Sequence, residues 1–375
     1  MELQNLFGIF SFTWQTAVML IIAGILIYLA IARDVEPVLL LPIGAGIILA
    51  NIPLAGLTEA NGILGLLRKA GIETELFPLL IFIGVGAMID FGPVLARPSL
   101  VLLGAAAQFG IFGTFLLVYM IGDGWLHLMP FTLKQAASIG VIGSADGPTS
   151  IYVSSLLAPE LLGPIVVAAY SYMALVPIIQ PPIMRLLTTK KERNIRMSSK
   201  AGEVSKRTKI LFPIVTIIVV GLVAPMATPL IGFLMFGNLL RESGVVARLA
   251  STAENELVNI VTILLGLTIG GMMPGSEFLK PQTIMIFVMG IVAFALDTAT
   301  GVIFGKIMCL VSKGKVNPLI GAAGISAFPM AARVAQKVGL KENPHNHLLM
   351  QAAGANTAGQ IASVVAGGAI LALLL

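Results

Sequence analysis

Apolar runs long enough to cross a lipid bilayer recur along almost the whole of this 375-residue chain. A membrane-spanning helix takes roughly 20 predominantly apolar residues. The run at 210–240 contains Pro225 and Pro229, so it can hold a span and a shorter helix. The sequence predicts an all-α polytopic membrane protein with about ten or eleven transmembrane segments. The runs lie at about 14–32, 37–54, 77–94, 99–121, 136–158, 161–188, 210–240, 257–274, 281–312, 317–336 and 347–375.

The composition excludes most other classes of protein. Charged residues make up 11% of the chain and apolar residues 57%, whereas about 25% of residues are charged in a soluble domain. A soluble enzyme, a disordered chain and a nucleic-acid-binding protein are therefore excluded. The one cysteine, Cys309, excludes a disulfide framework and a multi-cysteine metal site. The chain also lacks the G-x-x-x-x-G-K-[ST] sequence of ATP-driven motors.

Positive charge gathers in one polar stretch in the middle of the chain. From Arg185 to Lys209 there are nine lysines and arginines, opposed only by Glu192 and Glu203. Lysines and arginines concentrate in the cytoplasmic loops of membrane proteins. The stretch therefore predicts a cytoplasmic loop of an inner (cytoplasmic) membrane protein. A docking surface for an acidic partner or for anionic lipid is the alternative interpretation of the same charges.

The halves of the chain on either side of this basic loop resemble each other. GSADGPTSIYV (143–153) aligns with GISAFPMAARV (324–334), which pairs Gly143 with Gly324, and a later match pairs Tyr172 with Asn356. The segments at 79–104 and 261–290 are also similar. Secondary transporters are commonly duplicated in this way, with the binding site between the repeats. We predict an N-terminal extra helix (1–36), a first membrane repeat (37–188), a basic loop (189–209) and a second membrane repeat (210–375).

The stretch at 137–155 carries the strongest functional signal. Gly143, Gly147 and Pro148 weaken or break a helix inside an apolar run, and Asp146 adds a carboxylate. A carboxylate costs at least about 2.5 kcal/mol at the centre of a membrane helix, which makes it a functional-site candidate. Its oxygens suit a small hard cation or a proton. The alternative is a kink in which Asp146 only caps the start of a helix.

The matching stretch NPLIGAAGISAFPMAARVAQ (317–336) predicts a second interrupted helix. Asn317 and Ser326 supply amide and hydroxyl oxygens, and Gly321 lies between them. Arg333 follows, and it can bind an anionic substrate or balance the buried carboxylate. The alternative for Arg333 is a side chain that extends to the membrane interface.

Three further polar residues in the apolar runs are candidates. Asn356 and Gln360 are one helical turn apart and share a face, so we expect Asn356 at the site. Tyr172 lies in the matched run of the first half, where a satisfied core tyrosine is the alternative. Asp297 lies deep in the run at 281–312. It is either a second charged site or the structural partner of a basic residue, and the sequence does not decide between them.

These residues resemble those of a known family, the β subunits of the biotin-dependent, sodium-translocating decarboxylases. The family acts on oxaloacetate, methylmalonyl-CoA, glutaconyl-CoA or malonate. The resemblance covers nearly the whole chain, and Asp297 is not part of the family pattern. It is carried by GSADGPT (143–149), SYM (171–173), NPLIGAAGISAFPMAARV (317–334) and the run around Asn356.

The resemblance implies a fold and a transport cycle. The fold is two inverted repeats with interrupted helices, which work as an elevator. Carboxybiotin on a partner chain is decarboxylated, a proton from the far side is consumed, and Na⁺ is exported. The family's Na⁺-site positions fall on Asp146, Asn317 and Asn356, and those of a second Na⁺ or proton site fall on Tyr172 and Ser326.

The resemblance also implies partners and further roles. Gly321 matches a backbone position beside the Na⁺ site, and Arg333 matches a position tied to carboxybiotin, so Arg333, Asp146 and Tyr172 are the expected catalytic residues. The biotin is expected on a partner, because this chain has no Met-Lys-Met attachment sequence. The expected partners in an oligomeric complex are a biotin carrier, a carboxyltransferase and a small membrane-anchor subunit. The compact length favours an acyl-CoA substrate such as glutaconyl-CoA or methylmalonyl-CoA.

Two other functions stay open on the residues alone. An elevator-type secondary Na⁺ symporter or Na⁺/H⁺ antiporter uses broken helices with the same oxygen ligands. Such a transporter moves Na⁺ without any biotin partner. A noncatalytic membrane scaffold is the second alternative, but it leaves Asp146 without a role.

Overall fold

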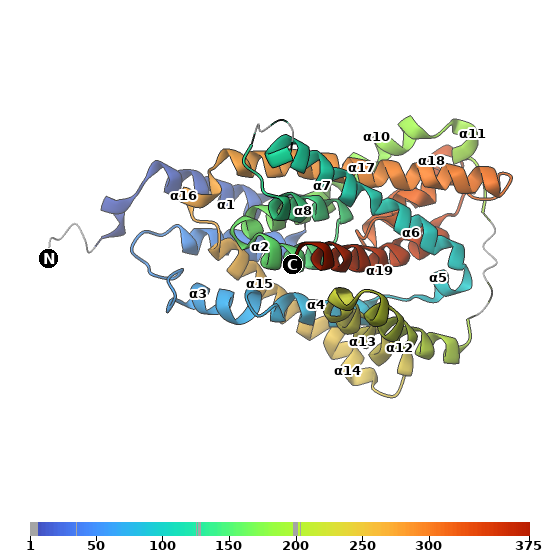
Figure 1. Ribbon diagram of the computed structural model, residues 1–375, viewed down its shortest axis with the longest axis horizontal. Coiled ribbons are helices and arrows are strands. Elements are labelled where there is room, and N and C mark those ends of the chain that lie inside the picture. Colours follow the sequence, from blue (N-terminus) through green and yellow to red (C-terminus); the bar gives the residue numbers. More distant parts are fainter. Residues whose placement is uncertain (1–6, 35, 125, 127–128, 198–201, 203) are drawn as a thin grey trace.

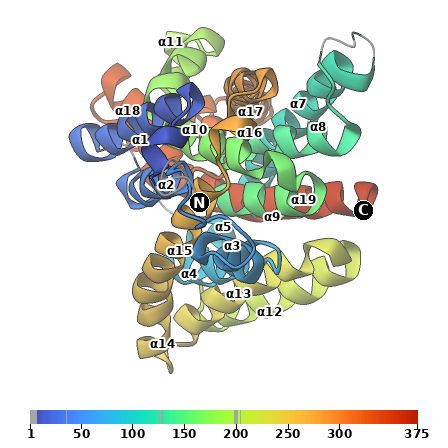
Figure 2. The ribbon, with the colours of Figure 1, turned by 90° about the vertical axis from the view of Figure 1, so that its left-hand side faces the viewer.

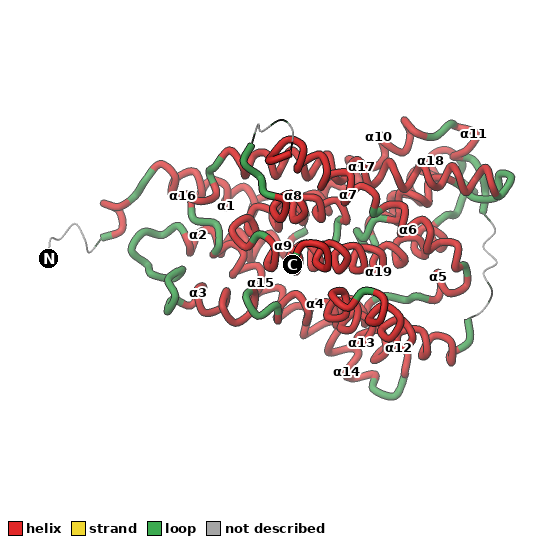
Figure 3. Tube along the Cα trace, viewed as in Figure 1, coloured by secondary structure: helices red, strands yellow, loops and turns green. Residues whose placement is uncertain are grey.

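The computed structural model describes residues 7–34, 36–124, 126, 129–197, 202 and 204–375. Within these ranges the chain is built from helices and loops, with no strand (Figure 3). The molecule is elongated, and α1, α4, α17 and α19 run roughly along its long axis (Figure 1). This all-helical architecture confirms the predicted fold class at the level of secondary structure.

Several helices are long and apolar enough to cross a membrane. Within the described ranges there are five of them by length and composition, or up to seven if each of two bent pairs forms one span. The bent pairs are Ile63–Ile72 with Leu76–Met88, at 61°, and Pro159–Met173 with Leu175–Leu187, at 65°. Several helices of this kind are typical of a multi-pass membrane protein. The predicted number of ten or eleven spans stays a prediction. The five are Trp14–Arg33, Pro98–Gly124, Ala247–Gly271, Pro281–Val311 and Leu349–Leu374.

The helices of the first half follow the predicted apolar runs. The run at 14–32 forms α1, and the run at 136–158 is interrupted between α8 and α9. Their bounds are α1 Trp14–Arg33, α2 Pro37–Ala50, α3 Ile63–Leu67, α4 Leu76–Met88, α5 Gly92–Ala96, α6 Val101–Ala107, α7 Phe109–Tyr119, α8 Leu133–Gly140, η6 Val141–Ser144, α9 Gly147–Leu157 and α10 Leu162–Leu187.

A short helix lies in the basic loop, and the helices of the second half follow it. The run at 210–240 divides at Pro225 into two helices, as its prolines allow. The bounds are α11 Lys190–Arg193, α12 Lys206–Val223, α13 Thr228–Ser243, α14 Ala247–Thr252, α15 Val258–Gly271, α16 Gly275–Phe278, α17 Pro281–Val311, η10 Pro318–Gly324, α18 Met330–Glu342 and α19 Leu349–Leu374.

Glycines let pairs of helices from the two halves pack backbone against backbone. A Cβ atom added to Gly86 of α4 would lie 1.8 Å from the carbonyl oxygen of Leu234, and one added to Gly237 of α13 would lie 1.8 Å from that of Ile83. The crossing of α2 and α15 uses Gly46 in the same way. Small residues at such crossings are typical of membrane helices, whose association depends on close packing.

The outward faces of the peripheral helices are apolar. Ile21 and Ile25 of α1, and Leu211, Val215 and Leu222 of α12, are exposed. Viewed along the long axis, α12, α13 and α14 lie on one side and α1, α10 and α17 on the other, with α19 between them (Figure 2). Apolar side chains at the rim suit contact with lipid, whereas the polar candidates Asp146, Asn317 and Asn356 lie inside.

The basic loop is tied to the second half of the chain by ion pairs. Arg193 Nε lies 3.1 Å from Glu342 Oε1, and Lys306 Nζ lies 3.7 Å from Glu192 Oε1. Burial works to raise the pKa of Glu192, but the Thr189 hydrogen bonds and Lys306 hold it below its usual value. Two charged residues of the loop, Lys200 and Glu203, lie outside the described residues.

The close crossing of α4 and α13 generates a test of the packing. We expect Gly237→Ala to destabilise the protein by about 1–3 kcal/mol, because the added methyl group meets backbone that cannot rotate away. Gly232→Ala on the same helix is the matched control, since nothing lies within 4 Å of its added Cβ. Thermal unfolding of the purified protein in detergent measures both. Equal melting temperatures for the two variants would contradict the crossing.

Candidate cation site at two crossing interrupted helices

The first interrupted helix breaks just before Asp146. α8 ends at Gly140, a 3-10 turn follows, and Ala145 adopts a left-handed conformation with φ of 53°. Asp146 is the N-cap of α9, since its Oδ1 atom accepts a hydrogen bond from the backbone N–H of Thr149 at 3.2 Å. A non-glycine residue in this conformation costs about 1–3 kcal/mol. The surrounding structure therefore has to hold the break in place.

The carboxylate of Asp146 is buried and held by hydroxyl groups from two helices. Only 3% of the residue is exposed. Its Oδ2 atom accepts hydrogen bonds from the hydroxyl groups of Thr149, at 2.7 Å, and of Ser363 in α19, at 2.6 Å. Asp146 is thus more than a helix cap. No ion pair among the described residues involves it, and such a buried carboxylate suits a cation or a proton.

The second interrupted helix breaks between η10 and α18, and polar side chains of α19 satisfy the break. The carbonyl oxygen of Ile325 accepts a hydrogen bond from Asn356 Nδ2 at 2.6 Å, and that of Ser326 accepts one from the side-chain amide of Gln360. The Ser326 hydroxyl donates to the carbonyl oxygen of Gly359 at 2.8 Å. Backbone groups freed at membrane depth need such internal partners.

The two breaks meet each other directly. The backbone N–H of Ser326 donates a hydrogen bond to the carbonyl oxygen of Ser144 at 2.9 Å. The approach is close because glycines lie at the contact. A Cβ added to Gly324 would lie 2.4 Å from the Leu103 carbonyl oxygen, and one added to Gly359 would lie 2.2 Å from that of Gly324. The breaks, α6 and α19 therefore form one tightly packed crossing.

Three of the predicted site residues lie together at this crossing. A continuous series of hydrogen bonds runs from Asp146 through Ser363 and Gln360 to Ser326. Asn356 joins it at Ile325, and its Oδ1 atom is buried without a hydrogen-bond partner among the described residues. An unpartnered buried acceptor in the same hydrogen-bonded cluster as a carboxylate fits an oxygen-coordinated cation. We call the following residues the crossing site: Asp146, Thr149, Ser326, Asn356, Gln360 and Ser363.

Asn317 and Gly321 occupy structural positions in η10. Asn317 Nδ2 donates to the carbonyl oxygens of Arg193, at 3.1 Å, and Ile195, at 2.8 Å, so it fastens the start of η10 to the basic loop. Gly321 packs against Gly301 of α17, where an added Cβ would lie 2.0 Å from a carbonyl oxygen. No hydrogen bond of these two residues reaches Asp146, and their part in ion binding stays a prediction.

Of the two neighbouring tyrosines, Tyr170 lies beside the crossing site. A Cβ added to Gly147 would lie 2.0 Å from the Tyr170 ring. Tyr172 instead packs on Gly290 and donates its hydroxyl proton to the carbonyl oxygen of Phe287. Residues two apart on a helix point about 200° away from each other, so the helical geometry separates the two rings. The proposed role of Tyr172 stays a prediction.

Arg333 lies away from the crossing site, on an exposed groove. This groove has a volume of about 390 Å³ and is lined by Arg333, Lys337 and Lys341, one helical turn apart along α18, and by Leu349. A row of cations at this spacing presents a single basic face. An exposed groove suits the binding of an anionic group carried by a partner protein. It suits the alternative role of Arg333, pairing with the buried Asp146, less well.

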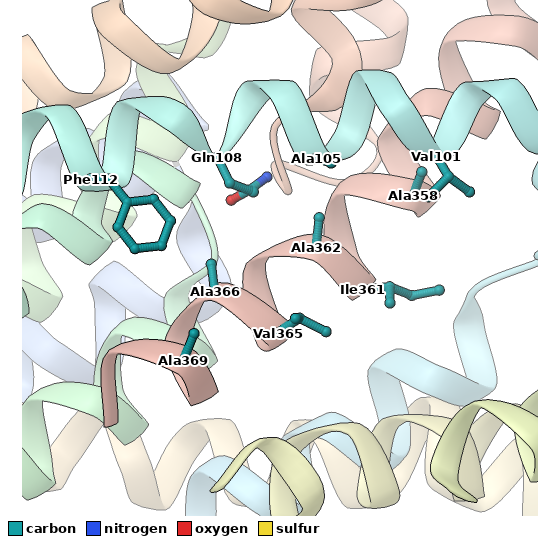
Figure 4. Close-up of a pocket in the computed structure, with 10 residues that line it drawn as sticks. All are labelled: Val101, Ala105, Gln108, Phe112, Ala358, Ile361, Ala362, Val365, Ala366 and Ala369. Carbon is teal, nitrogen blue, oxygen red and sulfur yellow. The ribbon is translucent and has the colours of Figure 1, made fainter. Parts of the chain in front are cut away.

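A second groove of about 390 Å³ lies between α6–α7 and α19 (Figure 4). Alanine, valine, isoleucine and phenylalanine side chains line it, and Gln108 is the polar exception. The lining lacks the oxygen ligands that a cation needs. This groove is therefore separate from the crossing site.

Sequence reasoning picked out Ser326 and Asn356 but did not assign Ser363 or Tyr170 to the site. Ser363 lies three residues after Gln360, so the shared helical face of α19 was the available signal. For Tyr170 the sequence held no such signal, because its contact with Gly147 joins two different helices.

Comparison with known proteins gives a consistent result. The family model described as "Na+-transporting oxaloacetate decarboxylase beta subunit" matches residues 15–374. The chain is 50% identical to oxaloacetate decarboxylase beta chain 2 of Salmonella typhi, over 96% of this chain and 95% of that protein. It is 54% identical to methylmalonyl-CoA decarboxylase subunit beta of Veillonella parvula, over 98% and 95%, and 50% identical to that of Propionigenium modestum, over 98% and 96%.

The hydrogen bond from Ser363 to Asp146 generates a prediction. We expect Ser363→Ala to weaken Na⁺ binding about tenfold, because a hydrogen bond to a charged group contributes about 1.5–3 kcal/mol. Ser155→Ala is the control, since its hydroxyl donates to the Tyr152 carbonyl oxygen and not to Asp146. Calorimetric titration of Na⁺ into each purified variant measures the affinity. An unchanged dissociation constant in Ser363→Ala would remove this hydroxyl from the site.

Proposed function

This chain belongs to the family of the Na⁺-transporting decarboxylase beta subunits, and we propose that its crossing site binds the transported Na⁺. The observation that carries the proposal is the geometry of Asp146. Its carboxylate is buried without a counter-cation, where two interrupted helices and α19 meet. A beta chain works within a multi-subunit enzyme, so energy for transport can come from a reaction on another subunit.

The crossing site supplies oxygen ligands from both halves of the chain. Asp146 and Thr149 come from the first half, and Ser326 and Asn356 from the second. Moving one charge against 100 mV costs about 2.3 kcal/mol. In this proposal Na⁺ enters from the cytoplasm, neutralises Asp146 and leaves on the far side. A proton taken up from the far side replaces the charge of Na⁺ in the protein for the return.

We propose that the halves are two inverted repeats that work as an elevator. The packing supports this, because each half places its last long helix on the interrupted helix of the other half. α10 packs against α18, and α19 packs against α9. The proposed units are the repeats at 37–188 and 210–375, preceded by α1 within 1–36 and joined by the loop at 189–209.

The basic groove on α18 is the proposed place where the partner-borne substrate arrives. Arg333 can pair with the carboxylate of carboxybiotin, which a biotin carrier subunit presents. Loss of CO₂ from that group consumes one proton. The end of α18 is joined to the basic loop through the Arg193–Glu342 ion pair, so both features belong to one face. The positive charge of this face supports a cytoplasmic orientation in the inner membrane.

The other proposed partners are a carboxyltransferase and a small membrane-anchor subunit. The carboxyltransferase would choose the substrate, since the crossing site holds only an ion. We infer an acyl-CoA substrate from the compact length of this chain. Its alignment with the Veillonella parvula protein spans 367 positions, against 414 with the Salmonella typhi protein. Relatives named for oxaloacetate match at similar identity, so oxaloacetate belongs in the same experiment.

The experiment that tests this function uses inverted membrane vesicles from cells that express the whole complex. Uptake of radioactive Na⁺ is followed after adding oxaloacetate, methylmalonyl-CoA, glutaconyl-CoA or malonate, with and without avidin. We expect one substrate to drive uptake, avidin to abolish it, and Asp146→Asn to reduce it to the background. Exchange that responds only to an imposed Na⁺ gradient, and not to avidin, would make the chain a secondary transporter.

The basic groove gives a separate prediction. We expect Arg333→Ala to lower substrate-driven Na⁺ uptake about tenfold or more, because a charge-assisted hydrogen bond to the substrate is lost. Na⁺ affinity should stay the same, since Arg333 lies on an exposed groove away from Asp146. Arg248→Ala, an exposed arginine on α14 outside this groove, serves as the control. Loss of Na⁺ affinity in Arg333→Ala would assign this residue to the ion site instead.

A further inference from the structure

A second buried carboxylate, that of Asp297, lies next to the turn of the first interrupted helix. Asp297, in the middle of α17, is 0% exposed. A Cβ added to Gly110 of α7 would lie 1.8 Å from its Oδ1 atom, and one added to Gly143 would lie 2.6 Å from its Oδ2 atom. Asp297 is therefore wedged between α7 and the turn that precedes Asp146. The crossing site described above does not use it.

Asp297 lacks a charged partner among the residues that the structure describes. Neither carboxylate oxygen has a hydrogen-bond partner among the described residues, and the backbone N–H groups of Gly110 and Ile111 lie beside it without reaching hydrogen-bond geometry. No ion pair of the described chain includes it. An isolated ionised carboxylate in such surroundings is very costly, whereas a protonated one is not.

The elements packed against α17 carry no charged group that contacts Asp297. These elements are α6, α7, α8, η6, α10 and η10, and α6, η6 and η10 contain no titratable residue at all. Of the others, Lys306 pairs with Glu192, and Tyr172 donates its hydroxyl proton to the carbonyl oxygen of Phe287. Titratable residues on the packed elements are Tyr119, Lys134, Tyr170, Tyr172 and Arg185, and those on α17 itself are Lys306 and Cys309.

At the second break a comparable contact is made by a hydrogen-bond donor. Gln108, at the junction of α6 and α7, donates from Nε2 to the carbonyl oxygen of Gly324, at 3.4 Å, in the second break. The alignment of the two halves pairs Gly324 with Gly143, which Asp297 contacts. In Figure 4 the Gln108 side chain extends from its helix toward α19. A protonated carboxyl can donate a hydrogen bond as an amide does, and an ionised carboxylate cannot.

We propose that Asp297 is a proton-binding site and that its proton is released when Na⁺ occupies the crossing site. The second part rests on the proposed function of Asp146. Gly143 and Asp146 are three residues apart, which is at most about 11 Å of chain. In a water-poor interior, a cation bound at Asp146 favours the ionised form of Asp297. Asp297 would then hold a proton while the crossing site is empty, and it would lose this proton when Na⁺ binds at Asp146.

Infrared difference spectroscopy on the purified complex tests the proton directly. A protonated carboxylic acid has a C=O stretch that is distinct from that of an ionised carboxylate. We expect a signal from a protonated carboxyl in the Na⁺-free protein, and we expect Asp297→Asn to remove about one carboxyl per chain from it. Added NaCl should reduce the same signal, whereas choline chloride at equal concentration should not.

Asp146→Asn separates this proposal from the Na⁺ site. In that variant the Asp297 signal should persist, but NaCl should no longer change it. A signal that is absent from the wild type, or unchanged in Asp297→Asn, would overturn the proton site whatever Asp146 does. Full Na⁺ binding in Asp146→Asn would instead overturn the proposed function and leave the Asp297 assignment standing. Asp297→Ala gives the same readout if the asparagine variant does not assemble.

Discussion

One backbone hydrogen bond holds the two interrupted helices at their crossing. The N–H of Ser326 reaches the carbonyl oxygen of Ser144 at 2.9 Å, so each break supplies a partner that the other lacks. Inside a membrane an unpaired backbone group costs several kcal/mol, and water is not there to replace it. The rest of the arrangement follows from this constraint, since breaks that open the helices have to be closed by other protein groups.

α19 closes the remaining gaps and creates a polar interior by doing so. Asn356 and Gln360 donate to the carbonyl oxygens of the second break, and Ser363 donates to Asp146 at the first. Of these side chains, Ser363 reaches the buried carboxylate directly. In the proposed function, structural need and ion binding are met by one set of side chains, and small residues such as Gly359 keep the three segments close enough to share it.

The candidate site was only partly predictable from the sequence. Asp146 is visible because a carboxylate between glycine and proline in an apolar run has few structural explanations, and Ser326 and Asn356 follow from its matched stretch and from helical spacing. Ser363 and Tyr170 belong to the site through contacts between different helices, which spacing along one helix does not reveal. Asn317 and Tyr172 each have a hydrogen-bond partner other than Asp146, and their part in the site stays a prediction.

The sequence by itself determined the class of the protein, the approximate limits of most of its apolar helices and the positions of both breaks. These properties depend on local composition, because apolar length, proline and glycine act on the chain within one or two turns. Only the tertiary structure decided which segments of the two halves contact each other. It placed Gly86 against α13, Ser144 against Ser326, and Asp297 against Gly143. Such contacts depend on how whole helices pack, and the energy of packing is not stored in any single stretch of sequence.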